Sequence, residues 1–411
     1  MLEALYLKNV GPAEELAIAL RPRMNFLVGD NGLGKSFLLD IAWWVLTRTW
    51  ARRSVIPHAP PAVPPISFRY SKSTSGPFEY RSTFNRESEL WSVKAARPPI
   101  PGLVLYAQVD GGFAVWDPAR NYWKESRDRP ASYLFAPEEV WEGNALCEGL
   151  VRDWASWQRE GGDSFAALCK VLVALSPGPS EPLTPGELRK LSLDDPKRYP
   201  TLRMPYGQEV AVIHASAGMR RVIALAYLLV WTWQEHVAAC QLRGSAPARE
   251  IIFLIDEVEA HLHPQWQRRI VPALLEVMDV LTGEHDSAVQ LLIATHSPLV
   301  LASTESRFDP AKDAIWSLDL VADAVELEEV PWRKRGDANG WLNSPLFDLE
   351  EPRSIEAEVA LRQAHALLRR RDAATPAEVE QVDALLRGAL GDVDRFWVRW
   401  SAFAEQVRGA S

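Results

Sequence analysis

Residues 29–36 read Gly-Asp-Asn-Gly-Leu-Gly-Lys-Ser, a complete G-x-x-x-x-G-K-[ST] motif. The apolar run Met24–Val28 precedes it and predicts a buried strand, and an apolar helical pattern follows over residues 36–50. Phosphate-binding loops lie in this strand–loop–helix context, where glycines let backbone N–H groups point at phosphate oxygens. Lys35 would reach the terminal phosphates, and the Ser36 hydroxyl would ligate Mg²⁺. The motif predicts an α/β P-loop fold; the alternative is an ordinary glycine-rich turn.

Two carboxylates follow the fully apolar segment Ile251–Ile255, which predicts a strand buried on both faces. In P-loop enzymes a carboxylate at the end of such a strand holds Mg²⁺, so we assign Asp256 to the metal. Glu257 comes directly after it and is placed to act as the general base on the attacking water. Taken alone, this pattern is also that of an ordinary strand end, and it gains weight from the neighbouring motifs.

Two further motifs place a histidine and a serine at the ends of predicted elements. The buried strand Leu291–Ala294 leads into Thr-His-Ser-Pro, so His296 could sense a γ-phosphate; the alternative is a satisfied histidine in a turn. Ser216, followed by Gly218, begins a long apolar helix over residues 216–240, and a helix start of this kind can bind an anion. Read alone, Ser216 is a helix N-cap, and it needs an anion only if a phosphate arrives from another subunit.

The composition of the 411-residue chain limits the class of protein. The formal net charge of -9 argues against a general nucleic-acid coat, although local basic clusters at 333–335 and 369–371 leave DNA as a candidate partner. Three widely spaced cysteines give neither a disulfide framework nor metal-ligand spacing, which predicts a reducing cytoplasm. The most apolar long run, Ala224–Trp233, is too short to span a membrane, so no membrane partner is expected.

The pattern along the chain divides it into three parts. Residues 1–56 and 205–330 predict the core; residues 57–204 predict an inserted lobe, which starts with a proline-rich break; and residues 331–411 predict a helical region. Short β-branched and aromatic segments over residues 66–116 predict an antiparallel meander, and residues 137–175 predict helices. A single helix is expected from the end of the Ile251–Ile255 strand to about Leu281, and another begins at Pro376 with Thr375 as its N-cap.

The order of the four motifs, P-loop, serine–glycine, Asp-Glu strand and histidine, resembles that of the ABC-ATPase superfamily. The P-loop, LIDEVEAHLHP at 254–264 and ATHSP at 294–298 look like the soluble branch of RecF and SMC repair ATPases and OLD-like "AAA family" ATPases of bacterial defence systems. LYLKNVGPAEEL at 5–16 resembles the same group, and the similarity covers about residues 1–50 and 205–305. It implies an ABC-type head with a mixed sheet flanked by helices, an antiparallel β subdomain and an inserted helical lobe.

The resemblance also implies ATP and Mg²⁺ as cofactors, ATP hydrolysis, and a homodimer with composite sites. Ser216 and Gly218 would contact the γ-phosphate of the opposite subunit. The family's glutamine between Mg²⁺ and the inserted lobe would be Gln108, with Gln158 left open. Asp256 would be the Mg²⁺ ligand, Glu257 the catalytic base and His296 the switch histidine. The nucleotide-binding and Mg²⁺-binding loop would comprise Gly29, Asn31, Gly32, Gly34, Lys35 and Ser36.

The sequence departs from the family pattern in several places. Residues 216–220 read Ser-Ala-Gly-Met-Arg where transporters have Ser-Gly-Gly-Gln, but an anion site needs only the serine and the backbone. His261 and His263 lack a third ligand nearby, so we expect no metal there. Proline breaks and β-segments between the first two motifs exclude the long heptads of SMC arms. Asp392-Val393-Asp394 is expected to be a turn between helices, not part of a nuclease.

Three hypotheses for the biological role remain open. The first is an ATPase of bacterial anti-phage defence that controls a separate DNA-directed effector. Here the pattern, including DRFWVRWSAF at 394–403, looks most like the Septu-type ATPase paired with an HNH nuclease; a RecF-type repair ATPase is the related alternative. The second is the cytoplasmic ATPase subunit of a transporter, against which ATHSP and the missing signature glutamine argue. The third is a scaffold in which nucleotide only sets the oligomeric state.

Overall fold

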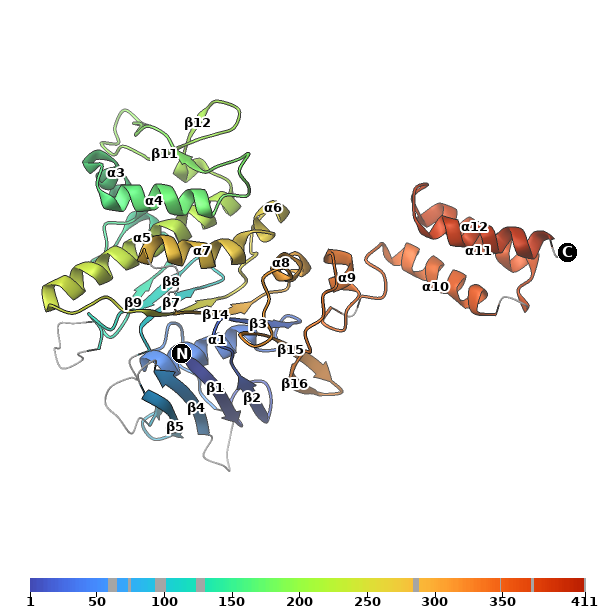
Figure 1. Cartoon of the computed structure of the whole chain (residues 1–411), viewed down its shortest axis with the longest axis horizontal. Helices are drawn as coiled ribbons and strands as arrows, with labels where there is room; N and C mark the ends of the chain where they lie inside the picture. The colour runs from blue at the N-terminus through green and yellow to red at the C-terminus, as the bar shows by residue number, and fades with distance from the viewer. Residues whose placement is uncertain are drawn as a thin grey trace. The chain divides into compact units, whose positions relative to one another are not determined.

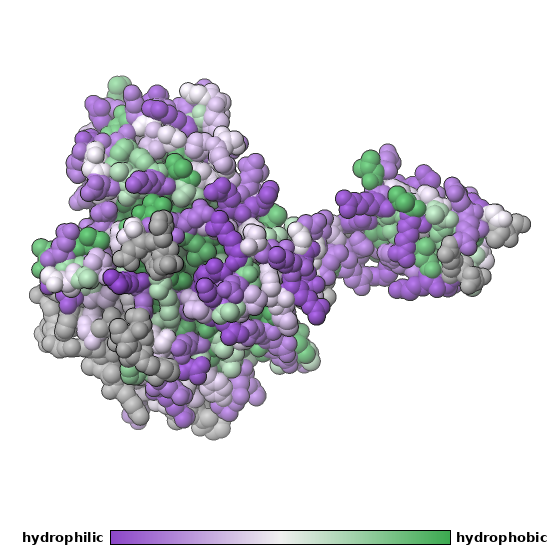
Figure 2. Space-filling model, in the orientation of Figure 1, coloured by the Kyte–Doolittle hydropathy of each residue, from purple (hydrophilic) through white to green (hydrophobic). Residues whose placement is uncertain are grey.

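The computed structural model describes residues 1–57, 65–72, 75–92, 101–122, 130–283, 288–347, 349–370 and 373–409, and it separates into two units. The N-terminal unit comprises Met1–Gly336 and the C-terminal unit Asp337–Ser411. Most of the predicted proline-rich break at 57–65, and Arg371 of the second basic cluster, lie outside the described residues. On the face shown in Figure 2, hydrophilic side chains predominate on each unit.

The centre of the N-terminal unit is an eight-stranded sheet (Figure 1), and it is mixed, as the resemblance implied. Five neighbouring strands run parallel, and antiparallel strands extend both edges. In spatial order the strands are β16 (Ala324–Glu329), β15 (Asp313–Val321), β3 (Met24–Gly29), β14 (Ala288–Ala294), β13 (Glu250–Ile255), β7 (Leu103–Ala107), β8 (Phe113–Trp116) and β9 (Tyr133–Phe135). The five parallel strands are mostly buried, as expected when helices cover both faces.

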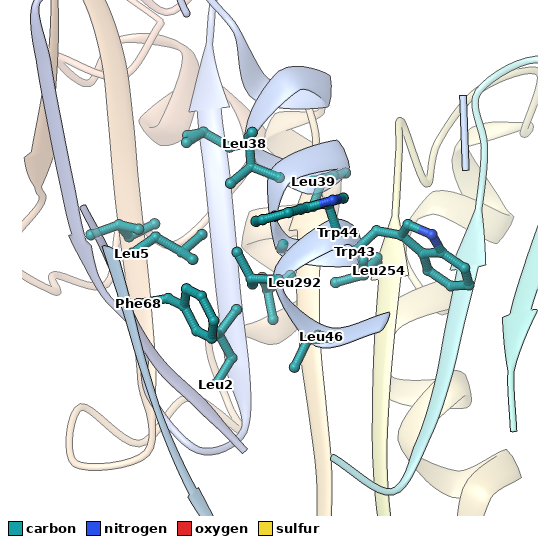
Figure 3. Close-up of a cluster of buried hydrophobic side chains, with 14 of the residues drawn as sticks. Leu2, Leu5, Leu38, Leu39, Trp43, Trp44, Leu46, Phe68, Leu254 and Leu292 are labelled. Atoms are coloured by element: carbon teal, nitrogen blue, oxygen red, sulfur yellow. The ribbon is translucent and has the colours of Figure 1, made fainter. Parts of the chain in front are cut away.

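A second sheet is antiparallel and packs against helix α1 (Lys35–Thr47). Its strands, in spatial order, are β2 (Glu15–Ala19), β1 (Leu2–Lys8), β4 (Pro65–Lys72), β5 (Ser75–Asn85) and β6 (Leu90–Trp91). Helix α1 presents Leu38 and Trp44 to one core cluster shared by both sheets, with Phe68 from β4 and Leu254 from β13 (Figure 3). The P-loop helix is therefore fixed on two sides by buried apolar contacts.

The predicted meander over residues 66–116 is wrong in its second half. Strands β4, β5 and β6 form antiparallel pairs, but β7 leaves them and runs parallel to β13 in the main sheet. The segment Leu103–Ala107 is almost entirely buried, which is typical of a parallel strand. The single helix predicted after Ile255 is also wrong: Glu257 and His261 have positive φ angles, and a loop with short α6 (Pro264–Gln267) precedes α7 (Ile270–Thr282).

Helices α5 (Ala217–Arg243) and α7 cover the face of the main sheet opposite α1 (Figure 1). Around them lie α2 (Pro137–Glu142), α3 (Leu150–Glu160), α4 (Asp163–Ala174), the 3₁₀ turn η1 (Val212–His214) and α8 (Pro298–Thr304), together with a small sheet of β10 (Thr184–Pro185), β11 (Thr201–Arg203) and β12 (Glu209–Ala211). Among the described residues, one helix, α5, has the length and apolar composition needed to cross a membrane. However, 67% of its most apolar window is buried in the unit.

The C-terminal unit is helical and has its own core. It contains α9 (Ala338–Leu342), α10 (Ile355–Arg369), α11 (Pro376–Ala389) and α12 (Phe396–Gly409). Trp400 is fully buried in its core, and its indole N–H donates to Asp383 Oδ1 at 2.9 Å. The predicted start of α11 is confirmed, with Thr375 and Glu378 forming a capping box. Residues 392–394 lie between α11 and α12, as predicted.

Candidate nucleotide site

Three of the motifs, together with Gln108, converge at one edge of the main sheet. Strands β3, β14, β13 and β7 are adjacent and parallel, so their carboxyl ends meet there. The P-loop follows β3, His296 follows β14, Asp256 and Glu257 follow β13, and Gln108 follows β7. The sheet order therefore brings together residues that are more than two hundred positions apart in the chain.

The P-loop has a backbone that requires glycine at its first and last glycine positions. Gly29 has a φ of 140°, and a Cβ there would lie 2.2 Å from the carbonyl oxygen of Leu318. Gly34 has a φ of 107° and is the N-cap of α1. Lys35 is buried, and its Nζ donates to the carbonyls of Gly29 (2.7 Å) and Asp30 (2.8 Å). Burial lowers the pKa of Lys35 from its usual value.

The predicted metal ligands lie together. Ser36 Oγ donates to Asp256 Oδ1 at 2.9 Å, and Asp256 is fully buried at the end of β13. Hydroxyl and carboxylate oxygens are hard ligands of the kind that Mg²⁺ prefers, and one or two protein ligands suffice when phosphates supply others. The donor set therefore fits a nucleotide-bound Mg²⁺. In the described part of the chain, no group of three or more His, Cys, Asp or Glu residues could hold a metal alone.

The predicted base Glu257 and the predicted phosphate sensor His296 lie next to each other. His296 Nε2 lies 3.1 Å from Glu257 Oε1, and the two side chains are 31% and 35% exposed. Nδ1 of the same ring lies 3.3 Å from the Gly29 carbonyl oxygen, so His296 also touches the P-loop. Glu257 has a φ of 48°, a left-handed conformation that is uncommon outside glycine. A partly exposed carboxylate here can reach a water molecule while staying next to the phosphate loop.

The two candidate glutamines lie in different places. Gln108 follows β7, next to Asp256, whose N–H donates to the carbonyl of Ala107 at 3.0 Å. Its Nε2 donates to the Ala51 carbonyl at 3.3 Å. Gln158 lies on α3, where it bonds Trp154 and the Gly186 carbonyl. Gln108 therefore stays the prediction for the Mg²⁺-linked residue.

Ser216 and Gly218 lie at the start of α5. Ser216 is the N-cap, its side chain is exposed, and its Oγ accepts a hydrogen bond from Met219 N at 3.4 Å. Gly218 is buried, and a Cβ there would lie 2.5 Å from the His261 carbonyl oxygen. The glycine thus has a packing role within the chain, where α5 meets the segment after Glu257. His263, by contrast, caps α6 through its Nδ1.

Several charged residues at the site were not identified from the sequence. Arg52 donates to Asp256 Oδ2 at 2.8 Å and lies 3.8 Å from Asp40, which also accepts the Tyr106 hydroxyl at 3.0 Å. Arg221 donates to the carbonyls of Gln108, Val109, Asp256 and Glu257, which ties α5 to two of the strand ends. Burial lowers the pKa of Arg221. Arg221 directly follows the serine–glycine motif, but no spacing in the sequence marks Arg52.

Comparison with known proteins agrees with this geometry. Residues 162–302 match the family model described as "AAA domain, putative AbiEii toxin, Type IV TA system", a range that includes Ser216, Asp256, Glu257 and His296. The chain is 30% identical over 100 residues to the "Retron Ec83 probable ATPase" of Escherichia coli, covering 24% of this chain and 15% of that protein. It is 32% identical over 101 residues to the "Retron Vc95 probable ATPase" of Vibrio cholerae serotype O1 biovar El Tor, covering 24% and 17%.

Among solved structures, the SMC head domain from Thermotoga maritima aligns with 80% of this chain and 99% of that chain, at 14% identity and a TM-score of 0.41. The matched segments span less than a fifth of the two retron relatives' lengths, so the comparison concerns the ATPase domain and not those whole proteins. The sheet order and the converging motifs are those of a P-loop ATPase fold, and the family match and the two relatives, both named as probable ATPases, agree with this at the level of the ATPase domain.

Proposed function

We propose that this protein hydrolyses ATP at composite sites formed between two copies of the chain. The observation that carries the proposal is the pairing of Ser36 with Asp256 at 2.9 Å beside the pairing of Glu257 with His296 at 3.1 Å. Both pairs lie at the end of the strands that hold the P-loop. Attack of water on a phosphoryl group requires ligands for the metal ion next to a general base, and these two pairs of residues supply both.

Each residue has a distinct role in this proposal. Lys35 and the loop N–H groups hold the phosphates, and Ser36 and Asp256 hold Mg²⁺, which supplies charge neutralisation when bound with ATP. Glu257 accepts the proton of the attacking water, and His296, which touches both Glu257 and Gly29, hydrogen-bonds the terminal phosphate. Gln108 contacts the Mg²⁺ shell from the end of β7. Departure of Arg52 from Asp256 Oδ2 would free that oxygen for the metal shell.

The second copy supplies the serine helix. Ser216 is exposed at the N-terminus of a 27-residue helix, where backbone N–H groups and the helix dipole favour an anion. We propose that Ser216 and Gly218 face the γ-phosphate held by the partner's P-loop, so that ATP joins the two copies.

At the level of the cell, we propose that the ATPase acts in bacterial anti-phage defence as the regulator of a separate DNA-directed effector, such as an HNH nuclease. The names of the two retron relatives support an ATPase role in such a system. Phage plating on cells that carry the native locus would test the role, with Lys35→Ala as the inactive variant. Loss of protection in that variant, and an effector nuclease that co-purifies with the chain, are the expected results; equal protection would contradict the proposal.

Glu257→Gln tests the biochemical proposal. The amide keeps the shape of the side chain but cannot accept the proton, so kcat should fall about 100-fold or more while ATP still binds. The variant should then accumulate as an ATP-dependent dimer, measured by light scattering coupled to size exclusion. Glu276→Gln is the matched control, because Glu276 pairs with Arg307 at the surface. A Glu257→Gln protein that stays monomeric with ATP and hydrolyses it at the wild-type rate would refute the site assignment.

A further inference from the structure

Glu259 has no role in the motifs described above, yet both of its carboxylate oxygens are used. Oε2 accepts a hydrogen bond from Thr295 Oγ1 at 2.8 Å, and Oε1 accepts one from the backbone N–H of His296 at 2.5 Å. Glu259 is half-buried and lies two residues after Glu257. One carboxylate therefore accepts two hydrogen bonds from the turn that carries the predicted phosphate-sensing histidine.

The orientation of His296 matters because its two ring nitrogens face two different oxygens. Nδ1 lies 3.3 Å from the Gly29 carbonyl and Nε2 lies 3.1 Å from Glu257 Oε1. A neutral imidazole can donate at only one nitrogen, so a small rotation changes whether it contacts the base or the P-loop. Hydrogen bonds to an ionised carboxylate are short and strong, and they can fix the backbone from which this ring projects.

Glu257 and Glu259 project from one well-anchored turn. Val258 between them is buried, the N–H of Ala260 donates to the Glu257 carbonyl at 2.9 Å, and the N–H of Leu262 donates to the Glu259 carbonyl at 2.9 Å. The turn thus sets the positions of the base and of the carboxylate that holds the histidine turn at the same time.

We propose that Glu259 is a positioning residue that aligns His296 between Glu257 and the P-loop through its two hydrogen bonds. The proposal rests on the proposed ATPase function for its kinetic consequence, but not for its structural one. Gln267 forms an independent link between the same segments, because it accepts from Ser297 Oγ at 2.7 Å and donates to the Leu262 carbonyl at 2.9 Å. A change at Glu259 should therefore alter the alignment of His296 without separating the two segments.

Steady-state kinetics tests the proposal through rescue and coupling. Glu259→Ala loses both bonds and should lower kcat about 10- to 100-fold, with KM for ATP changed by less than about threefold. Glu259→Gln keeps an acceptor for His296 N–H and offers a donor to Thr295, so it should recover kcat to within about threefold of wild type. In a His296→Ala background, Glu259→Ala should cause no further loss. Wild-type kcat in Glu259→Ala, failure of the Gln rescue, or additive losses would each overturn it.

A measurement without hydrolysis separates this proposal from the proposed function. The chain has 8 histidines, so ¹³C-labelled ring signals can be resolved by NMR and the His296 signal assigned from its absence in His296→Ala. In nucleotide-free protein that signal should move in Glu259→Ala and return in Glu259→Gln, even if the chain never hydrolyses ATP. If Glu259→Ala fails to fold, Thr295→Val is the second variant: it removes the bond from Thr295 Oγ1 to Glu259 and the bond that Thr295 Oγ1 accepts from Ser297 N, and it should still move the signal from its wild-type position. An unmoved signal in the folded variants would refute the positioning role.

Discussion

Asp117 is fully buried and Asp40 is half-buried, both in the N-terminal unit, and the chain satisfies the two aspartates differently. Asp117 accepts hydrogen bonds from His236 Nδ1 (2.8 Å), Arg120 Nε (2.7 Å) and Ala119 N (2.7 Å). Burial alone would raise the pKa of Asp117, yet these partners hold it below the usual value. Asp40, beside the nucleotide site, has the Tyr106 hydroxyl at 3.0 Å and Arg52 at 3.8 Å, and burial raises its pKa to about 6.

The Asp117 cluster also contains a histidine and a cysteine, the residue types of a nucleophilic site. Its hydrogen bonds, however, indicate a structural role and not a catalytic one. His236 Nε2 accepts the N–H of Ala248 at 2.8 Å, so that nitrogen is not free to take a proton from Cys240. Burial raises the pKa of Cys240. A cluster satisfied by its own chain stabilises the fold. At the nucleotide site, by contrast, we propose that the carboxylate of Asp256 takes its best partner, Mg²⁺, from outside, and that a second protomer completes the site.

The largest expected effect tests that dependence on a second protomer. Lys35→Ala should remove measurable ATPase activity, and Ser216→Arg should do the same by blocking the partner's γ-phosphate while leaving ATP binding within about twofold of wild type. Mixing the two inactive proteins creates heterodimers with one intact site, made from the wild-type P-loop of one chain and the wild-type serine of the other. Random exchange should restore about a quarter of the wild-type rate.

The control for this mixing experiment is the double variant, which carries Lys35→Ala and Ser216→Arg on the same chain. Its dimers have no intact composite site and should stay inactive. Recovery that never exceeds this control, under conditions where the subunits exchange, would mean that each site is complete within one chain.

A smaller effect is expected when the hydrogen-bonded cluster around Asp117 is disrupted. Asp117→Asn leaves Arg120 and His236 without their buried carboxylate, so the free energy of unfolding should fall by about 3–5 kcal/mol. Urea denaturation measures this change, and Glu235→Gln is the control because Glu235 contacts the same Arg120 from the surface at 3.4 Å. ATP affinity of the folded Asp117→Asn protein should stay within about twofold of wild type; a large loss of affinity would make the cluster functional.

Most residues of the candidate nucleotide site could be proposed from the sequence because the P-loop, the Asp-Glu pair and the histidine each come after a strand. An apolar segment followed by Gly29, Asp256 or His296 can be read locally, and parallel strands then bring the three ends to one edge. Arg52 could not be found in this way. It follows the helix that the P-loop begins, and its bond to Asp256 exists only because that helix packs beneath β13.

The fold class was predicted correctly, but one strand pairing and one loop were not. The mixed sheet, antiparallel sheet and C-terminal helices agree with the sequence patterns, but the pattern of Leu103–Ala107 could not reveal its partner strand. An apolar segment of five residues fits either a meander or a buried parallel strand, and pairing with β13 decides between them. The loop after Asp256 was missed because Glu257 and His261 have positive φ angles, a conformation that neither residue type favours locally.

The smallest expected effect concerns Asp40 and the pH dependence of stability. The folded-state pKa of about 6 lies above the ordinary 3.8, so the folded chain retains a proton that the unfolded chain has lost between these values. The wild type therefore loses stability as pH rises from about 4 to 6, by up to about 3 kcal/mol for a rise of this size. Asp40→Asn cannot ionise, and its amide oxygen can still accept the Tyr106 hydroxyl.

Relative to wild type, Asp40→Asn should therefore gain stability as pH rises from 4 to 6 and keep that gain at pH 7.5, by up to about 3 kcal/mol. Urea denaturation of the nucleotide-free proteins at matched pH values measures the difference, and comparison at each pH cancels the titration of all other groups. Asp117→Asn should show the opposite trend: its lowered pKa stabilises the wild type above about pH 4, and that advantage fades in acid. A pH-independent difference for Asp40→Asn would place its carboxyl among the satisfied groups and remove the contrast between the two aspartates.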